Sequence, residues 1–177
     1  MNAESTILVG VSGSPASLAA LRWARDEAER RECRLRIVLI WAPEQRASYA
    51  QHLYRDDGTK GPEQAWGRLT DAVRAVLGSG PWRNTTIEAV EGSVEQQLLA
   101  ASEDADLLVL GSGPTAAIGP VVRTCLIEAR CPVVVVSRGF GPSTVFPRDD
   151  KHMTDRAADP REYGRAPLPA GAVRVPA

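Results

Sequence analysis

Five short apolar runs alternate with segments of helical periodicity, and this alternation constrains the fold more than any other feature of the chain. The runs are candidate buried strands at residues 7–11, 35–41, 85–90, 106–110 and 133–136. Strict alternation of strands and helices is typical of a parallel sheet whose crossover helices cover both faces. The sequence therefore predicts an α/β fold with a five-stranded parallel sheet of the open, Rossmann-like kind.

Local signals mark where the intervening helices begin. Ser14 precedes Pro15, and serine caps the first amides of a helix whereas proline fits its first position. Ser93 and Gln96 match the capping-box spacing at the start of another helix. Helices are therefore expected from residue 14, from residue 62, from residue 93 and over 120–130.

The composition changes after residue 138. Residues 139–177 contain six prolines and four glycines, with few large apolar side chains. Such a segment buries too little surface to offset its loss of conformational entropy on ordering. We expect a folded domain over 5–138 and a disordered tail over 139–177 that is dispensable for folding.

Charge gives no electrostatic reason to bind nucleic acid or a membrane, because the net charge is -1 and both signs are dispersed. The first helix is expected to carry its charges on a solvated face: Arg22, Arg25, Asp26, Glu27, Glu29, Arg30, Arg31 and Glu32. The sequence shows neither a signal-peptide pattern nor an apolar run near the roughly 18 residues of a membrane span. A cytoplasmic location is expected.

Two loops are candidates for ligand binding. In open α/β sheets, ligands bind beyond the carboxyl ends of the strands, near the point where the strand order reverses. Two loops lie in such positions: the loop at 12–15, which follows the first strand, and the loop at 111–120, which follows the fourth. The candidate residues are Ser12, Gly111, Ser112, Gly113, Gly119, Val121, Val122 and Arg123.

Three segments resemble the universal stress protein family in their order along the chain. They are ILVGVSGSP (7–15), VEGSVEQQLLAASEDADLLVLGSG (90–113) and CLIEARCPVVVV (125–136). The resemblance extends over residues 5–138. It implies a five-stranded parallel sheet, usually in a dimer, and a function in stress response or regulation. The family divides into members that bind ATP and members that bind no nucleotide.

The phosphate loop departs from the pattern of the ATP binders, G-2x-G-9x-G-[ST], which follows a first strand that ends in aspartate. Gly111 matches the first glycine, but Pro114 stands in place of the second and Pro120 in place of the hydroxyl residue. Gly119 is retained, at eight positions from Gly111 rather than about thirteen, and Ser12 replaces the aspartate. The resemblance therefore predicts weak or absent ATP binding and no required cofactor.

Two other interpretations of these loops remain open. In the first, a remodelled loop over 111–123 binds ATP or AMP, with a phosphate received by the backbone amides of Val121 and Val122 and by Arg123. Its competitor is that Gly119 and Pro120 merely begin a helix. In the second, residues 12–17 resemble the SGGxDS loop of ATP pyrophosphatases, although the second glycine and the aspartate are absent.

Catalytic and metal-binding residues are not predicted. A nucleophile needs a base and an orienting acid, yet the sequence has no GxSxG motif, and His52 and His152 lie in a long loop and in the tail. Three cysteines without a CxxC spacing do not indicate a metal site. Cys125 and Cys131 are expected to be small buried side chains, and Trp66 is expected in the core. The chain is therefore predicted not to be an enzyme.

The last strand suggests a mode of assembly. Val133, Val134, Val135 and Val136 suit a buried strand, and the resemblance places this strand at an edge of the sheet. An apolar edge with unpaired backbone groups is an aggregation hazard that proteins pair or cover. We expect antiparallel pairing with a second copy, or with a related domain in a heterodimer, and a regulatory protein partner. The alternative is a monomer whose tail shields this edge.

Overall fold

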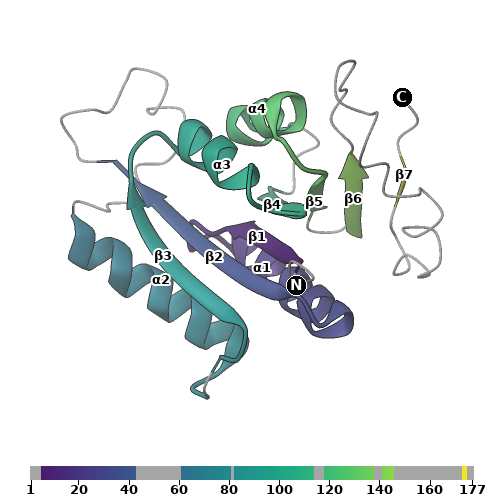
Figure 1. Cartoon of the computed structure of the whole chain (residues 1–177). Helices are drawn as coiled ribbons and strands as arrows, with labels where there is room; N and C mark the ends of the chain where they lie inside the picture. Colours follow the sequence, from purple (N-terminus) through teal and green to yellow (C-terminus); the bar gives the residue numbers. More distant parts are fainter. Residues whose placement is uncertain are drawn as a thin grey trace.

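A computed structural model describes residues 5–42, 61–80, 82–113 and 118–137, together with the backbones of 141–145 and 173–174. Five parallel strands alternate with four helices, which confirms the predicted α/β fold (Figure 1). The elements are β1 (Thr6–Gly10), α1 (Pro15–Arg31), β2 (Arg34–Trp41), α2 (Pro62–Leu77), β3 (Thr85–Glu91), α3 (Val94–Ser102), β4 (Leu107–Ser112), α4 (Pro120–Glu128), β5 (Val133–Ser137), β6 (Gly141–Val145) and β7 (Val173–Arg174).

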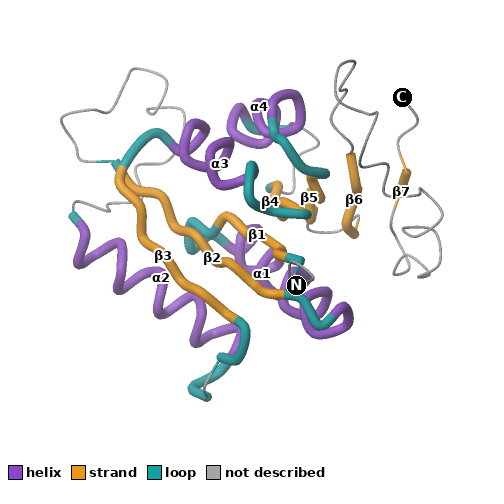
Figure 2. The backbone as a smooth tube through the Cα atoms, in the orientation of Figure 1, coloured by secondary structure: helices purple, strands orange, loops and turns teal. Residues whose placement is uncertain are grey.

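The strands form one sheet in the order β3-β2-β1-β4-β5-β6-β7 (Figure 2). β1 pairs in parallel with β2 on one side and with β4 on the other. The strand order therefore reverses between β1 and β4. Because β1 and β4 are parallel neighbours, their carboxyl ends lie at the same end of the sheet, together with the two candidate loops that follow them.

Helices cover both faces of the sheet. α1 and α2 pack on one face, where their side chains surround Ile7 and Val9 of β1; α3 and α4 pack on the other, against Leu8 (Figure 1). The valines of β5 alternate in the same way, since Val134 belongs to the first core and Val133 to the second. Burial on both faces explains why these strands are continuous apolar runs in the sequence.

The helix starts agree with the sequence in position and differ in one detail. Ser14 caps α1, and its Oγ accepts a hydrogen bond from the Ser17 backbone N–H at 3.2 Å. Ser93 is the residue before α3, but its side chain makes no cap bond, and its Oγ donates to a Glu95 carboxylate oxygen at 3.2 Å instead. The predicted capping box with Gln96 is therefore wrong.

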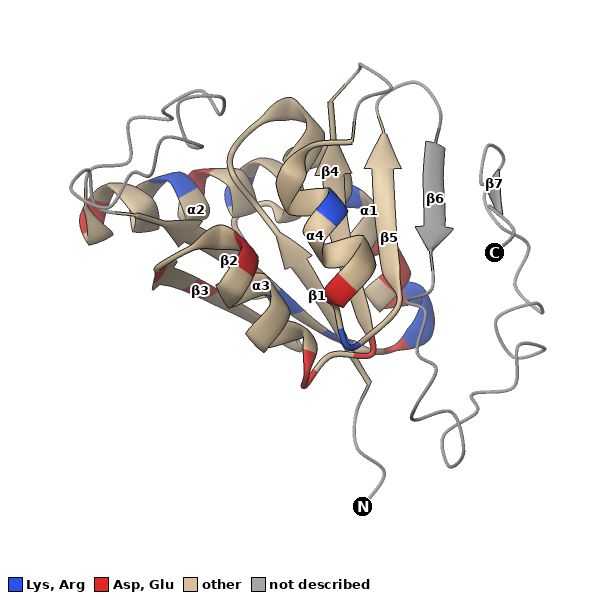
Figure 3. Cartoon of the chain, turned by 90° about the horizontal axis from the view of Figure 1, so that it is seen from above, with Lys and Arg blue, Asp and Glu red and all other residues tan. Residues whose placement is uncertain are grey.

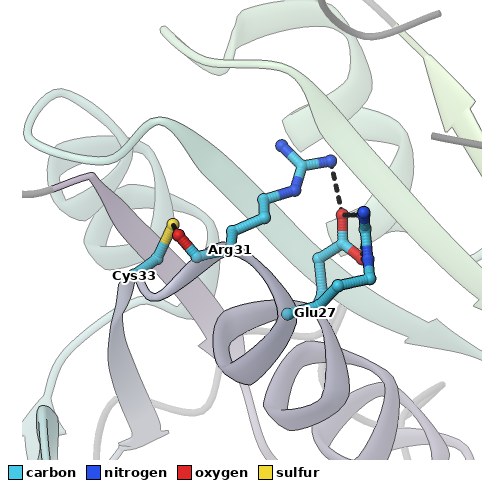
Figure 4. Close-up of polar contacts among 4 residues, drawn as sticks. Glu27, Arg31 and Cys33 are labelled. Carbon is cyan, nitrogen blue, oxygen red and sulfur yellow. Dashed lines mark hydrogen bonds and ion pairs between the residues drawn. The ribbon is translucent and has the colours of Figure 1, made fainter. Parts of the chain in front are cut away.

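Two predictions of burial are also wrong. Trp66 is 46% exposed, because the buried stripe of α2 runs along Ala65, Leu69, Ala72, Val73 and Val76 and leaves Trp66 beside it. Glu27, expected on a solvated face, is 8% exposed and forms ion pairs with Arg30 and Arg31 (Figure 4). The other charges of both signs are scattered over the elements (Figure 3).

The chain after residue 138 contributes two strands to the sheet. β6 pairs antiparallel with all of β5, from Ser137 opposite Gly141 to Val133 opposite Val145. β7 pairs with β6 in parallel at two positions. The prediction that β5 lies at the sheet edge is therefore wrong, whereas the disordered and dispensable character expected for 139–177 stays a prediction. The remaining residues of the predicted tail lie outside the described part of the chain.

Within the described ranges, none of the helices combines the length and the apolar character that crossing a membrane requires.

Candidate functional site

The loop after β1 is a tight turn whose hydroxyl groups are already bonded. Gly13 adopts a φ of 79°, a left-handed conformation that glycine accepts without strain. The Ser12 hydroxyl donates to the Ser14 Oγ at 3.1 Å, and Ser14 caps α1. The turn therefore starts the helix, which favours helix capping over the pyrophosphatase interpretation of residues 12–17.

A cation from α2 reaches this turn. Arg68 Nη2 donates a hydrogen bond to the Ser12 carbonyl oxygen at 3.0 Å. The same guanidinium lies beside Gly13, where a Cβ would come within 3.4 Å of Nη2. Sequence reasoning missed Arg68, because 56 positions separate it from Ser12 and no local motif marks it.

Gly111, the first glycine of the family pattern, has a packing role in this chain. A Cβ at this position would lie 2.4 Å from the Ala16 carbonyl oxygen and 2.7 Å from the Ser17 backbone nitrogen. The end of β4 therefore packs directly on the first turn of α1, which requires glycine whether or not a phosphate binds. Ser112 next to it is buried, whereas a Cβ on Gly113 would meet open space.

The start of α4 is built as a helix N-terminus. Gly119 precedes the helix in an extended conformation, Pro120 occupies the first position, and the Arg123 N–H donates to the Gly119 carbonyl at 2.9 Å. Val122 is buried in the core beneath α4, while the Arg123 side chain is exposed. Pro114 and the three residues after it lie outside the described residues.

The cysteines are buried, as predicted. Cys125 and Cys131 are 0% and 3% exposed, and burial raises the pKa of each thiol to about 12. Both thiols are therefore protonated near neutral pH, which makes them weak nucleophiles. Among the described residues, His, Cys, Asp and Glu side chains do not form any group of three that could hold a metal. His52 and His152 lie outside the described residues.

A shallow depression of about 200 Å³ lies on another part of the surface, between α3 and the strands β2 and β3. Its lining consists of Arg36, Val38, Val90, Gln97, Ala100, Ala101 and Asp104. Arg36 donates two hydrogen bonds of 2.9 Å to the Glu88 carboxylate, and this contact raises the pKa of Arg36. The depression contains none of the residues that the sequence singled out.

Comparison with known proteins identifies the family. The model of the universal stress protein family matches residues 5–137. The chain belongs to this family. Universal stress protein Rv2623 of Mycobacterium tuberculosis (strain ATCC 25618 / H37Rv) is 34% identical over 146 residues, which cover 76% of this chain and 48% of that protein. The chain described here thus spans about half the length of the curated universal stress proteins that it matches.

Solved structures of universal stress proteins share the fold. One, in complex with cAMP, has a TM-score of 0.55 at 24% identity, over 76% of this chain and 98% of that one. Another, from Archaeoglobus fulgidus in complex with dAMP, has a TM-score of 0.54 at 18% identity, over the same shares. At these identities the likeness concerns the arrangement of strands and helices.

Proposed function

We propose that this universal stress protein is a non-enzymatic regulatory protein of stress response that binds ATP weakly or not at all. The observation that carries the proposal is the short connection between β4, which ends at Ser112, and α4, which begins at Pro120. Only residues 113–119 join the two, and seven residues reach at most about 25 Å when fully extended. This connection is too short to follow the thirteen-position path that the phosphate loop of the ATP binders requires.

The neighbouring groups support the same proposal. Gly111 is required by the backbone of α1, and Ser14 is used as a helix cap. Pro120 has no N–H to offer a phosphate. The buried thiols of Cys125 and Cys131 are protonated, so they do not supply a nucleophile near neutral pH.

Isothermal titration calorimetry of the whole chain with ATP and Mg²⁺ tests the proposal. We expect no saturable heat, which corresponds to a dissociation constant above about 1 mM, or less than about 4 kcal/mol of binding free energy. Protein that arrives from purification with stoichiometric ATP, or that binds it with a micromolar dissociation constant, would contradict the proposal.

The second candidate is an AMP or ATP module that uses a remodelled loop over 111–123. It is favoured by the structural neighbours solved with cAMP and dAMP. In this candidate a single phosphate lies at the start of α4, near the backbone amides of Val121 and Val122 and the side chain of Arg123. A titration with AMP distinguishes the two: saturable binding that Arg123→Ala weakens, and that Arg22→Ala on α1 leaves unchanged, would establish this candidate.

Assembly with another protein is the remaining part of the proposal. The matched relatives have about half of their length outside the aligned region, which leaves room for a second domain beside one of this size. We propose that this chain acts in the cytoplasm through a second copy, a related domain or a regulatory protein. In the structure the residues of the expected contact, Val133 to Val136 in β5, are already paired with β6.

A further inference from the structure

β3 forms an outer edge of the sheet. It is the first strand in the sheet order, and within the described part of the chain it pairs with β2 alone, in parallel. Figure 2 shows β3 as the outermost strand on its side, with α2 running along it. The strand is seven residues long, and none of the seven is buried. An edge of this length presents a row of backbone groups that can pair with another chain.

Two hydrogen bonds at the ends of β3 determine which of its backbone groups face outward. The Leu35 N–H donates to the Asn84 carbonyl, and the Gly92 N–H donates to the Trp41 carbonyl. Asn84 and Gly92 therefore direct these groups toward β2. Successive residues of a strand direct their backbone groups to opposite sides. The groups that point away from β2 belong to the odd-numbered residues: Thr85, Ile87, Ala89 and Glu91.

The side chains of β3 form an apolar face and an acidic face. Ile87 and Ala89 pack against the core on the side of α2. Glu88 lies on the opposite face, where Arg36 Nε and Nη2 donate to its two carboxylate oxygens at 2.9 Å each. A carboxylate has about four lone-pair sites, and Arg36 uses two of them. The Glu88 side chain is 37% exposed, so it can accept further hydrogen bonds from a chain beside β3.

Acidic side chains predominate along this edge. β3 contains Glu88 and Glu91 and neither lysine nor arginine; Arg83 lies before its start. Asp104 lines the depression that also contains Arg36. A second copy of β3 would bring the same glutamates to the edge, and like charges on paired strands are destabilising. The composition therefore favours a partner strand with basic side chains over a second copy of this chain.

An exposed tryptophan flanks the same edge. Trp66 of α2 is 46% exposed. Arg68, two residues later, reaches the Ser12 carbonyl just after β1, and two residues correspond to about 200° around a helix. Trp66 therefore lies on the flank of α2 away from β1, beside the outer edge of β3 and at the end of the sheet where Glu91 lies. Tryptophan is enriched in interfaces between proteins, because it combines a large apolar area with one hydrogen-bond donor.

We propose that the outer edge of β3 binds an extended segment of a partner protein as an additional strand, with lysine or arginine beside Glu88 and apolar side chains beside Ile87 and Trp66. In such pairings the backbone hydrogen bonds supply affinity and the alternate side chains supply specificity. The inference rests on the assembly part of the proposed function, for which it names a surface and the chemistry of the regulatory partner. Its failure would leave the ATP prediction untouched, because the titration with ATP tests that part separately.

The probe is an acetylated and amidated peptide of alternating lysine and valine, of the same length as β3. Its matched control has glutamate in place of each lysine. NMR spectra and hydrogen exchange of the full chain follow the backbone amides during each titration. We expect the lysine peptide to bind at least about tenfold more tightly than the control and to protect the amides of Ile87 and Ala89. Equal affinities, or binding that leaves these two amides unprotected, would overturn the proposal.

Ala89→Pro removes one outward N–H from the edge. This N–H takes no part in the ladder with β2, and edge strands tolerate proline, so the variant should fold. The matched control is Ala89→Val, which keeps the N–H and raises the strand preference. We expect Ala89→Pro to weaken binding of the lysine peptide at least about fivefold and Ala89→Val to bind it as the unmodified chain does. A proline variant that binds with unchanged affinity would contradict strand addition.

A second variant leaves the strand intact. Trp66→Ala should weaken binding of the same peptide at least about fivefold, because it removes the apolar contact beside β3. Its control is Ile127→Ala, at a position of α4 that is 63% exposed, which should leave the affinity unchanged. Equal effects of the two substitutions would count against the contact with Trp66 and hence against the proposed surface.

Hydrogen exchange of the unmodified chain without peptide completes the test. The amides of Ile87 and Ala89 should exchange faster than those of Glu88 and Val90, which point toward β2. Equal protection of the two sets would mean that the edge is already covered, by another segment of the chain or by a second copy, and the proposal would fail.

Discussion

Gly111 and Ala16 meet backbone to backbone, so that a Cβ on Gly111 would lie 2.4 Å from the Ala16 carbonyl oxygen. The contact joins the end of β4 to the first turn of α1, at the carboxyl end of the strands, where both candidate loops lie. Because both contacting groups are backbone, neither can move without shifting a strand or a helix. The glycine of the nucleotide pattern is therefore also a stability determinant in this chain.

We expect Gly111→Ala to lower the free energy of unfolding by about 3 kcal/mol, because the added methyl overpacks a rigid contact. The matched control is Gly113→Ala, two residues away, where a Cβ meets open space and the change should stay within about 0.5 kcal/mol. Urea denaturation measures both. Equal effects of the two substitutions would contradict a packing role for Gly111.

Ser102 ties the end of α3 to the chain that follows α4. Its Oγ accepts a hydrogen bond from the Arg130 N–H at 3.1 Å and donates to the Leu99 carbonyl at 2.7 Å, and the residue is 0% exposed. Ser102→Ala leaves the Arg130 N–H without this acceptor and should cost about 1–3 kcal/mol in urea denaturation. Ser93→Ala is the control, because the Ser93 side chain makes no cap bond to the backbone. This substitution should change the free energy of unfolding by only about 0.3 kcal/mol.

Glu27, a buried residue of α1, forms ion pairs with two arginines of the same helix. Arg30 bonds both carboxylate oxygens, at 2.6 and 2.7 Å, and Arg31 pairs with the same carboxylate while its backbone carbonyl accepts from the Cys33 thiol (Figure 4). Glu27→Gln should lower stability by about 1 kcal/mol, an effect that weakens in high salt. Glu29→Gln, at an exposed position of the same helix, should be near neutral in parallel thermal melts.

The buried thiols predict how stability depends on alkaline pH. Burial raises the pKa of Cys125 and of Cys131 from 9.0 to about 12, so above pH 9 the unfolded chain releases protons that the folded chain retains. Their contribution is complete below pH 9 and is lost as the pH rises towards 12, at about 1 kcal/mol per pH unit for each thiol. Urea midpoints from pH 8 to pH 10 should fall less steeply in Cys125→Ala/Cys131→Ala than in the unmodified chain. Parallel slopes would contradict the assignment.

The parallel sheet was predictable because strands that are buried on both faces are continuous apolar runs in the sequence. Runs such as the one that contains Leu8 and Val9 have no polar alternation, and Ser14 before Pro15 marks the start of α1 by chemistry confined to adjacent residues. Features of this kind depend on the residue and its immediate neighbours, so they can be read locally.

The rest depends on contacts between distant segments. Arg68 bonds the Ser12 carbonyl through geometry that only the folded chain creates. Gly111 fits two explanations, a phosphate loop and a packing contact, and the sequence alone does not separate them. β6 escaped prediction because Gly141, Pro142 and Ser143 do not favour a strand; the edge of β5 supplies the pairing that their own preferences lack.

The direction of β6 decides where a C-terminal extension leaves the fold. The carboxyl end of β5 lies at the same end of the sheet as those of β1 and β4, where the candidate loops are. β6 runs antiparallel to β5, so the chain returns until Val145 lies opposite Val133. A fluorescent protein or affinity tag fused directly after Val145 would therefore leave the fold at the other end of the sheet, where the parallel strands begin. Fusion after Ser137 would instead place it next to the loops, so the choice of fusion point determines whether a reporter crowds the candidate site.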